Sequence, residues 1–212
     1  MKHRLFTLVE LLTVIAVIAI LAGIAVPVVV GMQSKGRETS ARADMSAIKM
    51  ALTQFKADYS VFPVTGTSSD TLYHAGYDAV ADDAYIDTLI SNLTLIQPTP
   101  GTNDVPQDYT FTINKKKRKY LDAPAKPVTA LFAVDSLTRG FMKLDPWGRR
   151  YNIALDTSYD KKISLDSTFL SGATAETIVG DIAIYSYGTS TKDASNNFDT
   201  EAFLYSWKTN AQ

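Results

Sequence analysis

The chain has 212 residues, of which 46% are hydrophobic and 20% are charged. Its 21 basic and 22 acidic side chains give a formal net charge of −1, so no global basic field favours nonspecific nucleic-acid binding. The proportions of hydrophobic and charged residues also exclude a disordered tail, a collagen-like repeat and a polytopic membrane protein. The absence of cysteine excludes disulfides, cysteine-ligated zinc, iron–sulfur clusters and cysteine nucleophiles.

The chain begins with a short basic head, Lys2 to Arg4, and continues with an apolar run in which Glu10 is the only charge. The uncharged stretch from Leu11 to Met32 has 22 residues, and about 20 apolar residues cross a bilayer as a helix. The basic head is expected to stay on the cytoplasmic side. A secretory signal peptide and a plain signal anchor are alternative interpretations, but neither explains a carboxylate inside the run.

A helical pattern continues beyond the apolar run. Apolar residues recur with steps of four and three at Ala41, Met45, Ile48, Leu52, Phe55 and Tyr59. Pro63 ends this pattern, so we predict one helix from about Phe6 to Tyr59, roughly 80 Å long. Pro27 removes a backbone hydrogen bond near Gly23, which predicts a kink or a meltable segment there.

The remaining sequence predicts a small mixed domain. Residues 64–81 and 97–106 are rich in loop-forming residues, and residues 85–93 have helical spacing. Asp145 to Gly148 has the pattern of a type I turn. Candidate strands lie at residues 109–113, 128–134, 151–155 and 182–187. One long helix followed by several strands predicts an α+β fold with an antiparallel sheet.

The residues from Phe6 to Leu12, followed by the apolar run and Pro27, resemble the N-terminus of type IV pilins and type II secretion pseudopilins. The resemblance implies a leader of residues 1–5, cut between Leu5 and Phe6 by a prepilin peptidase, and N-methylation of Phe6. The sequence departs from the family at Leu5, because the family usually has a small residue, most often glycine, at this position. Glu10 matches the family glutamate, which pairs with the N-terminal amine of a neighbouring subunit during assembly. The resemblance also places Gly23 and Pro27 in the helix that mediates assembly.

A second resemblance lies near the end of the chain. Leu144 to Gly148 with Tyr151, Ile184 to Gly188, and Ser206-Trp207 are similar to segments of major pseudopilins of type II secretion systems. The implied organisation is a membrane or filament-core half-helix at 6–33 and an exported pilin-like domain at 34–212. In that domain an amphipathic half-helix spans 34–60, a variable segment 64–140 and a β region 141–212.

The same resemblance implies a calcium ion in the polar loop between Thr189 and Glu201. Asp193, Asn197 and Asp199 are the candidate ligands, because calcium prefers carboxylate and amide oxygens. Ser190 stands where the family has its first aspartate. A solvated loop without a metal is the alternative.

Two further patterns bear on function. The basic run from Lys115 to Lys119 is compatible with a nucleic-acid surface, but a solvated hairpin tip is favoured because no aromatic stacking platform surrounds it. The only histidines are His3 and His74, and no hydrolase, metalloprotease or phosphate-binding motif is present, so no enzyme is predicted.

The leading hypothesis is therefore a structural subunit of a pilin-like filament that drives protein export by type II secretion. The resemblance places it as a single-pass protein of the bacterial inner membrane, with its C-terminal domain outside the cytoplasm. The implied partners are further copies, the prepilin peptidase, the inner-membrane assembly platform and minor pseudopilins, while nucleic acid is not expected. A surface type IV pilin and a membrane-anchored or secreted binding protein are the alternatives.

Overall fold

The computed structural model describes residues 8–64, 70–73, 89, 92–95, 113–122, 145–191, 193 and 198–208. The chain divides into two compact units, Met1–Thr39 and Ser40–Gln212. Each unit is described separately below.

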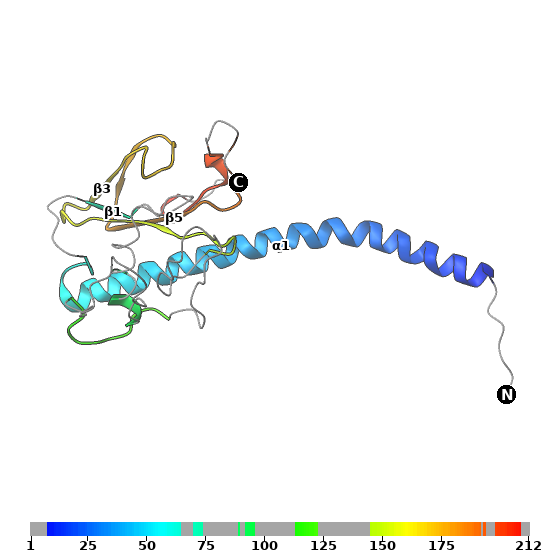
Figure 1. Cartoon of the computed structure of the whole chain (residues 1–212), viewed down its shortest axis with the longest axis horizontal. Helices are drawn as coiled ribbons and strands as arrows, with labels where there is room; N and C mark the ends of the chain where they lie inside the picture. The colour runs from blue at the N-terminus through cyan, green and yellow to red at the C-terminus, as the bar shows by residue number, and fades with distance from the viewer. Residues whose placement is uncertain are drawn as a thin grey trace, which may run out of the picture. The chain divides into compact units, whose positions relative to one another are not determined.

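The predicted long helix is present as α1, Leu8–Tyr59 (Figure 1). It contains 52 residues and continues through Gly23 and Pro27, so the backbone stays helical where a meltable segment was predicted. Its first two predicted residues, including Phe6, lie outside the described part of the chain. Near its other end Ser60 adopts a positive φ of 62°, and the buried Pro63 follows.

In the first unit, the large apolar side chains of α1 from Leu8 to Ile24 are 49–79% exposed. Among the described residues, no helix combines the length and apolar character needed to cross a membrane.

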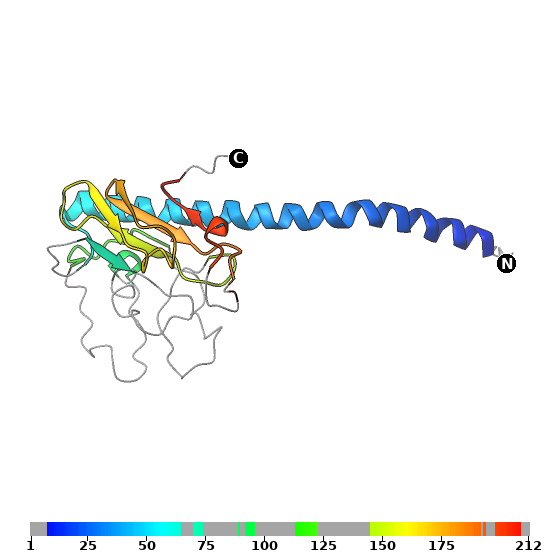
Figure 2. The ribbon, with the colours of Figure 1, turned by 90° about the horizontal axis from the view of Figure 1, so that it is seen from above.

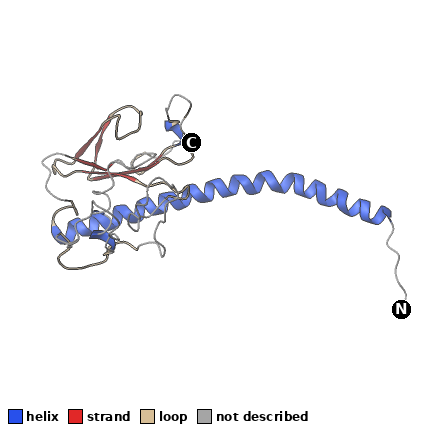
Figure 3. Cartoon of the chain, in the orientation of Figure 1, coloured by secondary structure: helices blue, strands red, loops and turns tan. Residues whose placement is uncertain are grey.

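The second unit contains a four-stranded antiparallel sheet and a separate two-stranded hairpin (Figure 3). The sheet has the order β1 (Thr71–Tyr73), β2 (Asn152–Leu155), β5 (Ile182–Ser186) and β6 (Leu204–Tyr205). The hairpin pairs β3 (Lys162–Leu165) with β4 (Glu176–Val179), and a short 3-10 helix, η1 (Thr200–Ala202), precedes β6. This arrangement confirms the α+β class.

The strands predicted at 151–155 and 182–187 are confirmed as β2 and β5. The prediction that 64–81 is all loop was wrong at β1, which forms because it pairs with β2 at the edge of the sheet. The strand predicted at 128–134 and most of that at 109–113 lie outside the described residues, as does most of the helix predicted at 85–93.

Both faces of the sheet are covered by other parts of the second unit. Successive side chains of β5 point alternately into two different apolar cores. Ile182 and Ile184 face the core formed with α1, whereas Ala183 and Tyr185 face the core formed with the β3–β4 hairpin. From α1, the predicted stripe supplies buried side chains to the first core: Ala41, Met45, Ile48, Leu52 and Phe55, with Tyr59 partly buried. Figure 2, turned from the view of Figure 1, shows the strands lying along this part of α1. Helix and sheet are therefore joined by one apolar contact within the second unit.

Candidate functional site

The described residues expected to act in assembly, Glu10, Gly23 and Pro27, lie in the N-terminal half of α1. Glu10 is in its first turn and is exposed, and the Glu10 carbonyl accepts a hydrogen bond from Thr13 Oγ1 at 3.0 Å. No atom lies within 4 Å of the position a Cβ on Gly23 would take, so that surface is open. Pro27 is inside the helix, while Leu5 and Phe6 lie outside the described residues. The structure thus places Glu10 on an accessible apolar helix but does not test its pairing with a neighbour.

The Asp145–Gly148 turn is built around a buried carboxylate. Gly148 N donates to Asp145 O at 2.9 Å, which closes the predicted turn. The Asp145 carboxylate also accepts hydrogen bonds from Trp147 N at 3.0 Å and Arg149 N at 2.8 Å. Burial raises the pKa of Asp145, although these hydrogen bonds oppose the rise.

The carboxylate of Asp145 connects this turn to the end of β5. Ser186 Oγ donates to Asp145 Oδ2 at 2.5 Å and accepts from Gly188 N at 3.0 Å. Gly188 has a φ of +58°, and a Cβ there would overlap the carbonyl oxygen of Ala202 in η1. Glycine is therefore required here, because any side chain at this position would displace η1 from the end of β5.

The candidate calcium loop contains one observation that fits a bound cation. Ser190 is only 2% exposed, and its Oγ has no hydrogen-bond partner among the described residues. The Ser190 carbonyl accepts from Arg149 Nη1 at 2.6 Å. Asp193 is exposed, and Asp199 caps η1 by accepting from Glu201 N at 3.1 Å. Asn197 lies outside the described residues, so the complete ligand set is not tested.

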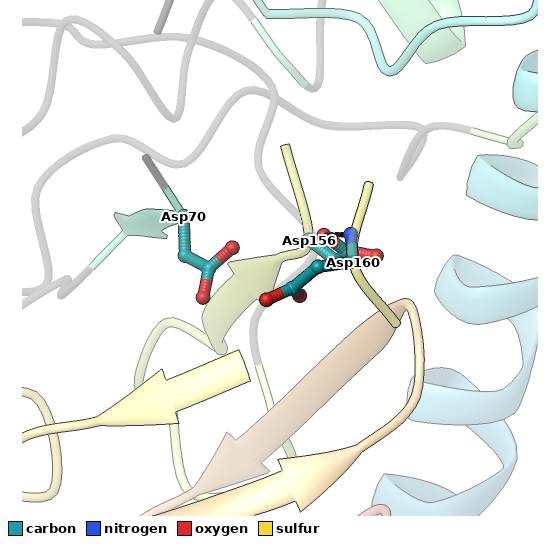
Figure 4. Close-up of side chains that lie close together, drawn as sticks. All are labelled: Asp70, Asp156 and Asp160. Carbon is teal, nitrogen blue, oxygen red and sulfur yellow. Dashed lines mark hydrogen bonds between the residues drawn. The ribbon is translucent and has the colours of Figure 1, made fainter. Parts of the chain in front are cut away.

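A different acidic group was missed by the sequence analysis. Oxygens of Asp70, Asp156 and Asp160 all lie within 4.8 Å of one another (Figure 4). Asp156 is fully buried, and its carboxylate already accepts from Asp160 N at 3.2 Å and Lys161 N at 2.9 Å. The local sequence could not reveal this group, because Asp70 is far from Asp156 in the sequence and joins it through tertiary contacts, namely the pairing of β1 with β2 and hydrogen bonds from Ser158 Oγ and Ser164 N. We refer to these three residues as the acidic cluster.

The basic run is not a free hairpin tip. Asn114 is buried, and its side chain donates to the carbonyls of Asn92 and Arg118, both at 2.7 Å. Lys116 Nζ donates at 2.9 Å to the carbonyl of Asp58, near the C-terminus of α1, where a positive charge is favourable.

Arg118 completes this attachment by pairing with the Asp58 carboxylate at 2.9 Å. Hydrogen bonds from Tyr120 and Arg118 lower the pKa of Asp58. Part of the basic run therefore holds its turn against the end of α1, while the Lys115 and Lys117 side chains remain exposed.

The α+β domain and the apolar N-terminal helix are together consistent with a pilin-like fold. In agreement, the chain is 35% identical to type II secretion system core protein G of Escherichia coli strain K12 over 74 residues, 35% of this chain and 51% of the relative. It is 36% identical to the protein of that name from Vibrio cholerae serotype O1 over 71 residues, 34% and 49% of the two chains. For the Pseudomonas aeruginosa protein the identity is 34% over 67 residues, 32% and 47%.

The chain thus spans about half the length of the curated relatives that it matches. No family model matches the chain. No solved structure matches it either. The resemblance to the major pseudopilin, first based on short motifs, is confirmed over about a third of the chain. The relatives are named as core proteins of a secretion system, and these names do not describe an enzyme.

Proposed function

We propose that this protein is a structural subunit, of the major pseudopilin type, in a filament that drives protein export by type II secretion. The observation that carries the proposal is the division of α1. One apolar face of its second half is buried in the domain core, whereas its large apolar side chains from Leu8 to Ile24 are 49–79% exposed. Exposed apolar surface of this extent is unfavourable in water, at about 25 cal/mol per Å², and favours burial against lipid or further helices.

Assembly requires the apolar helix to leave the inner membrane and join other copies. The uncharged run from Leu11 to Met32 supports a single membrane pass before assembly, with the basic head in the cytoplasm. Cleavage before Phe6 by a prepilin peptidase would create an amine close to Glu10. A carboxylate and an amine are both costly in an apolar environment, so pairing between subunits would fix their axial register. The assembly platform and minor pseudopilins are the expected further partners.

Two measurements on the full chain test this function. Mass spectrometry of the mature N-terminus should find a methylated Phe6, whereas a start near Val26 would indicate ordinary secretion. Glu10→Ala should leave a stable membrane protein that assembles poorly, and Glu38→Ala, which removes a half-buried carboxylate of α1 outside the apolar run, serves as the control. Normal filament yield from Glu10→Ala would contradict the assigned role. Loss of twitching without loss of exoprotein secretion in a deletion strain would indicate a surface pilin instead.

Calcium in the 189–201 loop is a second part of the proposal. The buried Ser190 Oγ, which has no hydrogen-bond partner in the described part of the chain, supports it, with Asp193, Asn197 and Asp199 as the other candidate ligands. A bound calcium would supply charge that holds the loop closed in a chain without disulfides. A chelator should therefore lower the melting temperature of the protein, and Asp199→Asn should reduce this effect. An unchanged melting curve would mean that the loop holds no metal.

A further inference from the structure

The Asp145–Arg149 turn contacts the start of the candidate calcium loop at two points within the second unit. At the first point, Ser186 Oγ donates to Asp145 Oδ2 at 2.5 Å and accepts from Gly188 N at 3.0 Å. At the second point, Arg149 Nη1 donates to the carbonyl oxygen of Ser190 at 2.6 Å. The turn therefore holds the backbone on which the loop begins.

The turn itself is fixed by its own hydrogen bonds and by the core. Asp145 N donates to the carbonyl oxygen of Arg149 at 2.7 Å, and Arg149 N donates back to the Asp145 carboxylate at 2.8 Å. Between these two residues, Trp147 packs against the core that the sheet forms with α1. These contacts set the position from which the Arg149 side chain reaches the loop.

The guanidinium of Arg149 contacts both ends of the short segment from Tyr187 to Ser190. Its Cζ lies 6.0 Å from the ring centroid of Tyr187, which is only 1% exposed, and such a contact between a cation and an aromatic ring is attractive. Ser190 N donates to the carbonyl oxygen of Tyr187 at 3.0 Å, which closes the segment into a turn. Arg149 thus fixes Ser190 relative to a buried aromatic residue.

The side chain of Ser190 is the part of this residue that can receive a cation. Ser190 is 2% exposed, and within the described part of the chain its Oγ has no hydrogen-bond partner. Its carbonyl oxygen already binds the guanidinium, which would repel a second cation at that oxygen. A neutral hydroxyl contributes more to calcium affinity when it is held in place, because less ordering entropy is then lost on binding.

We propose that the Asp145–Arg149 turn sets the calcium affinity of the loop, with Arg149 as the positioning residue that holds Ser190 so that its hydroxyl can act as a ligand. This inference rests on the calcium site proposed above. The positive charge of Arg149 opposes the binding of a second cation, so the proposal requires its positioning effect to exceed this repulsion. Loss of an outer contact of a metal ligand typically weakens metal binding about 10–100-fold.

Calcium titration of the full chain in detergent, followed by calorimetry, tests the role of Arg149. Arg149→Ala should raise the Kd for calcium about tenfold or more. Arg149→Lys keeps the charge and can donate to the same carbonyl oxygen, so its Kd should stay within about threefold of the unaltered value. An unchanged or lower Kd for Arg149→Ala would overturn the inference, because repulsion by the arginine would then equal or exceed its positioning effect.

Lys162→Ala is the control for charge, since it removes one positive charge from an exposed residue outside the turn and the loop. Its Kd should equal that of the unaltered chain, and a rise as large as that of Arg149→Ala would contradict a specific role for the arginine. Ser186→Ala breaks the other contact between the turn and the loop without changing any charge. It should also raise the Kd about tenfold, and a Kd equal to that of the unaltered chain would overturn the role of the turn.

Melting temperatures with and without calcium separate positioning from a merely structural role. A structural role lowers both temperatures equally and leaves the rise that calcium produces unchanged, whereas weaker binding makes that rise smaller at the same calcium concentration. We expect the smaller rise for Arg149→Ala and its recovery in Arg149→Lys; an equal rise in all three proteins would contradict positioning.

These measurements also separate the inference from the proposed calcium site. If the unaltered chain gives no binding heat and no calcium-dependent rise in melting temperature, the calcium site and the inference both fail. If it binds calcium and the variants bind equally well, only the inference fails.

Discussion

Replacing Gly188 by alanine should destabilise the second unit more than the same change at Gly172 or Gly180, which also have a positive φ but open surroundings. The φ of +58° at Gly188 costs an alanine about 1 kcal/mol. The added Cβ would also overlap the Ala202 carbonyl oxygen, and moving η1 away from β5 should cost about 1–3 kcal/mol more. The expected total loss in the free energy of unfolding is about 2–4 kcal/mol.

Gly172→Ala is the matched control, because Gly172 also has a positive φ, of +92°, but no atom lies within 4 Å of its hypothetical Cβ. It should therefore show only the conformational cost of about 1 kcal/mol. Urea unfolding of the full chain in detergent, followed by the fluorescence of Trp147 and Trp207, measures both. With a slope of about 2 kcal/mol per M urea, Gly188→Ala should lower the midpoint by about 1–2 M. Equal midpoints for the two variants would refute the steric argument.

Three further predictions concern the contacts that hold the second unit together. Ser186→Ala removes a donor from the buried Asp145 carboxylate and should cost about 1–3 kcal/mol in urea unfolding, and a loss below 0.5 kcal/mol would contradict this. Asn114→Ala should cost a similar amount and should speed proteolysis at the basic run; an unchanged digestion rate would argue against the attachment to α1. Partial burial alone would raise the pKa of Asp181, but hydrogen bonds from Lys56 and Lys161 lower this pKa below the ordinary value of 3.8. The stabilisation that the Asp181 carboxylate provides is therefore present above pH 3.8 and is lost as the pH falls through the lowered pKa. Acid unfolding curves should therefore show a weaker pH dependence below pH 4 for Asp181→Asn than for the unaltered protein.

The long helix and the central strands could be predicted because their patterns are local. The stripe from Ala41 to Phe55 follows the helical period, and that stripe packs in the core. Strand β5 was recognisable as a short apolar run, since both of its faces are buried. In contrast, β6 has two residues and β1 has three, and both exist because a neighbouring strand offers hydrogen bonds.

The candidate functional residues also divide into those that a local sequence pattern reveals and those that only the folded chain brings together. Glu10 stands out because it is the only charge in an apolar run, and Gly188 because it follows a recognisable strand. The acidic cluster combines residues that are far apart in the sequence, so only the folded chain brings their side chains together. The interpretation of the lysine run changed for the same reason, since its contact with Asp58 depends on tertiary structure.

The position of β6 in the core has a consequence for biosynthesis. Leu204 packs in the same apolar cluster as Ala41, and Ser206 exchanges hydrogen bonds with Ile184 in both directions at 2.8 Å. The core therefore needs residues separated by more than 160 positions before it can close. A ribosome that adds about 5–20 residues per second delivers the last of them roughly 10–30 seconds after the first. During that interval the nascent chain lacks its final strand, which leaves time for a translocation machine or chaperone to engage it before folding is complete.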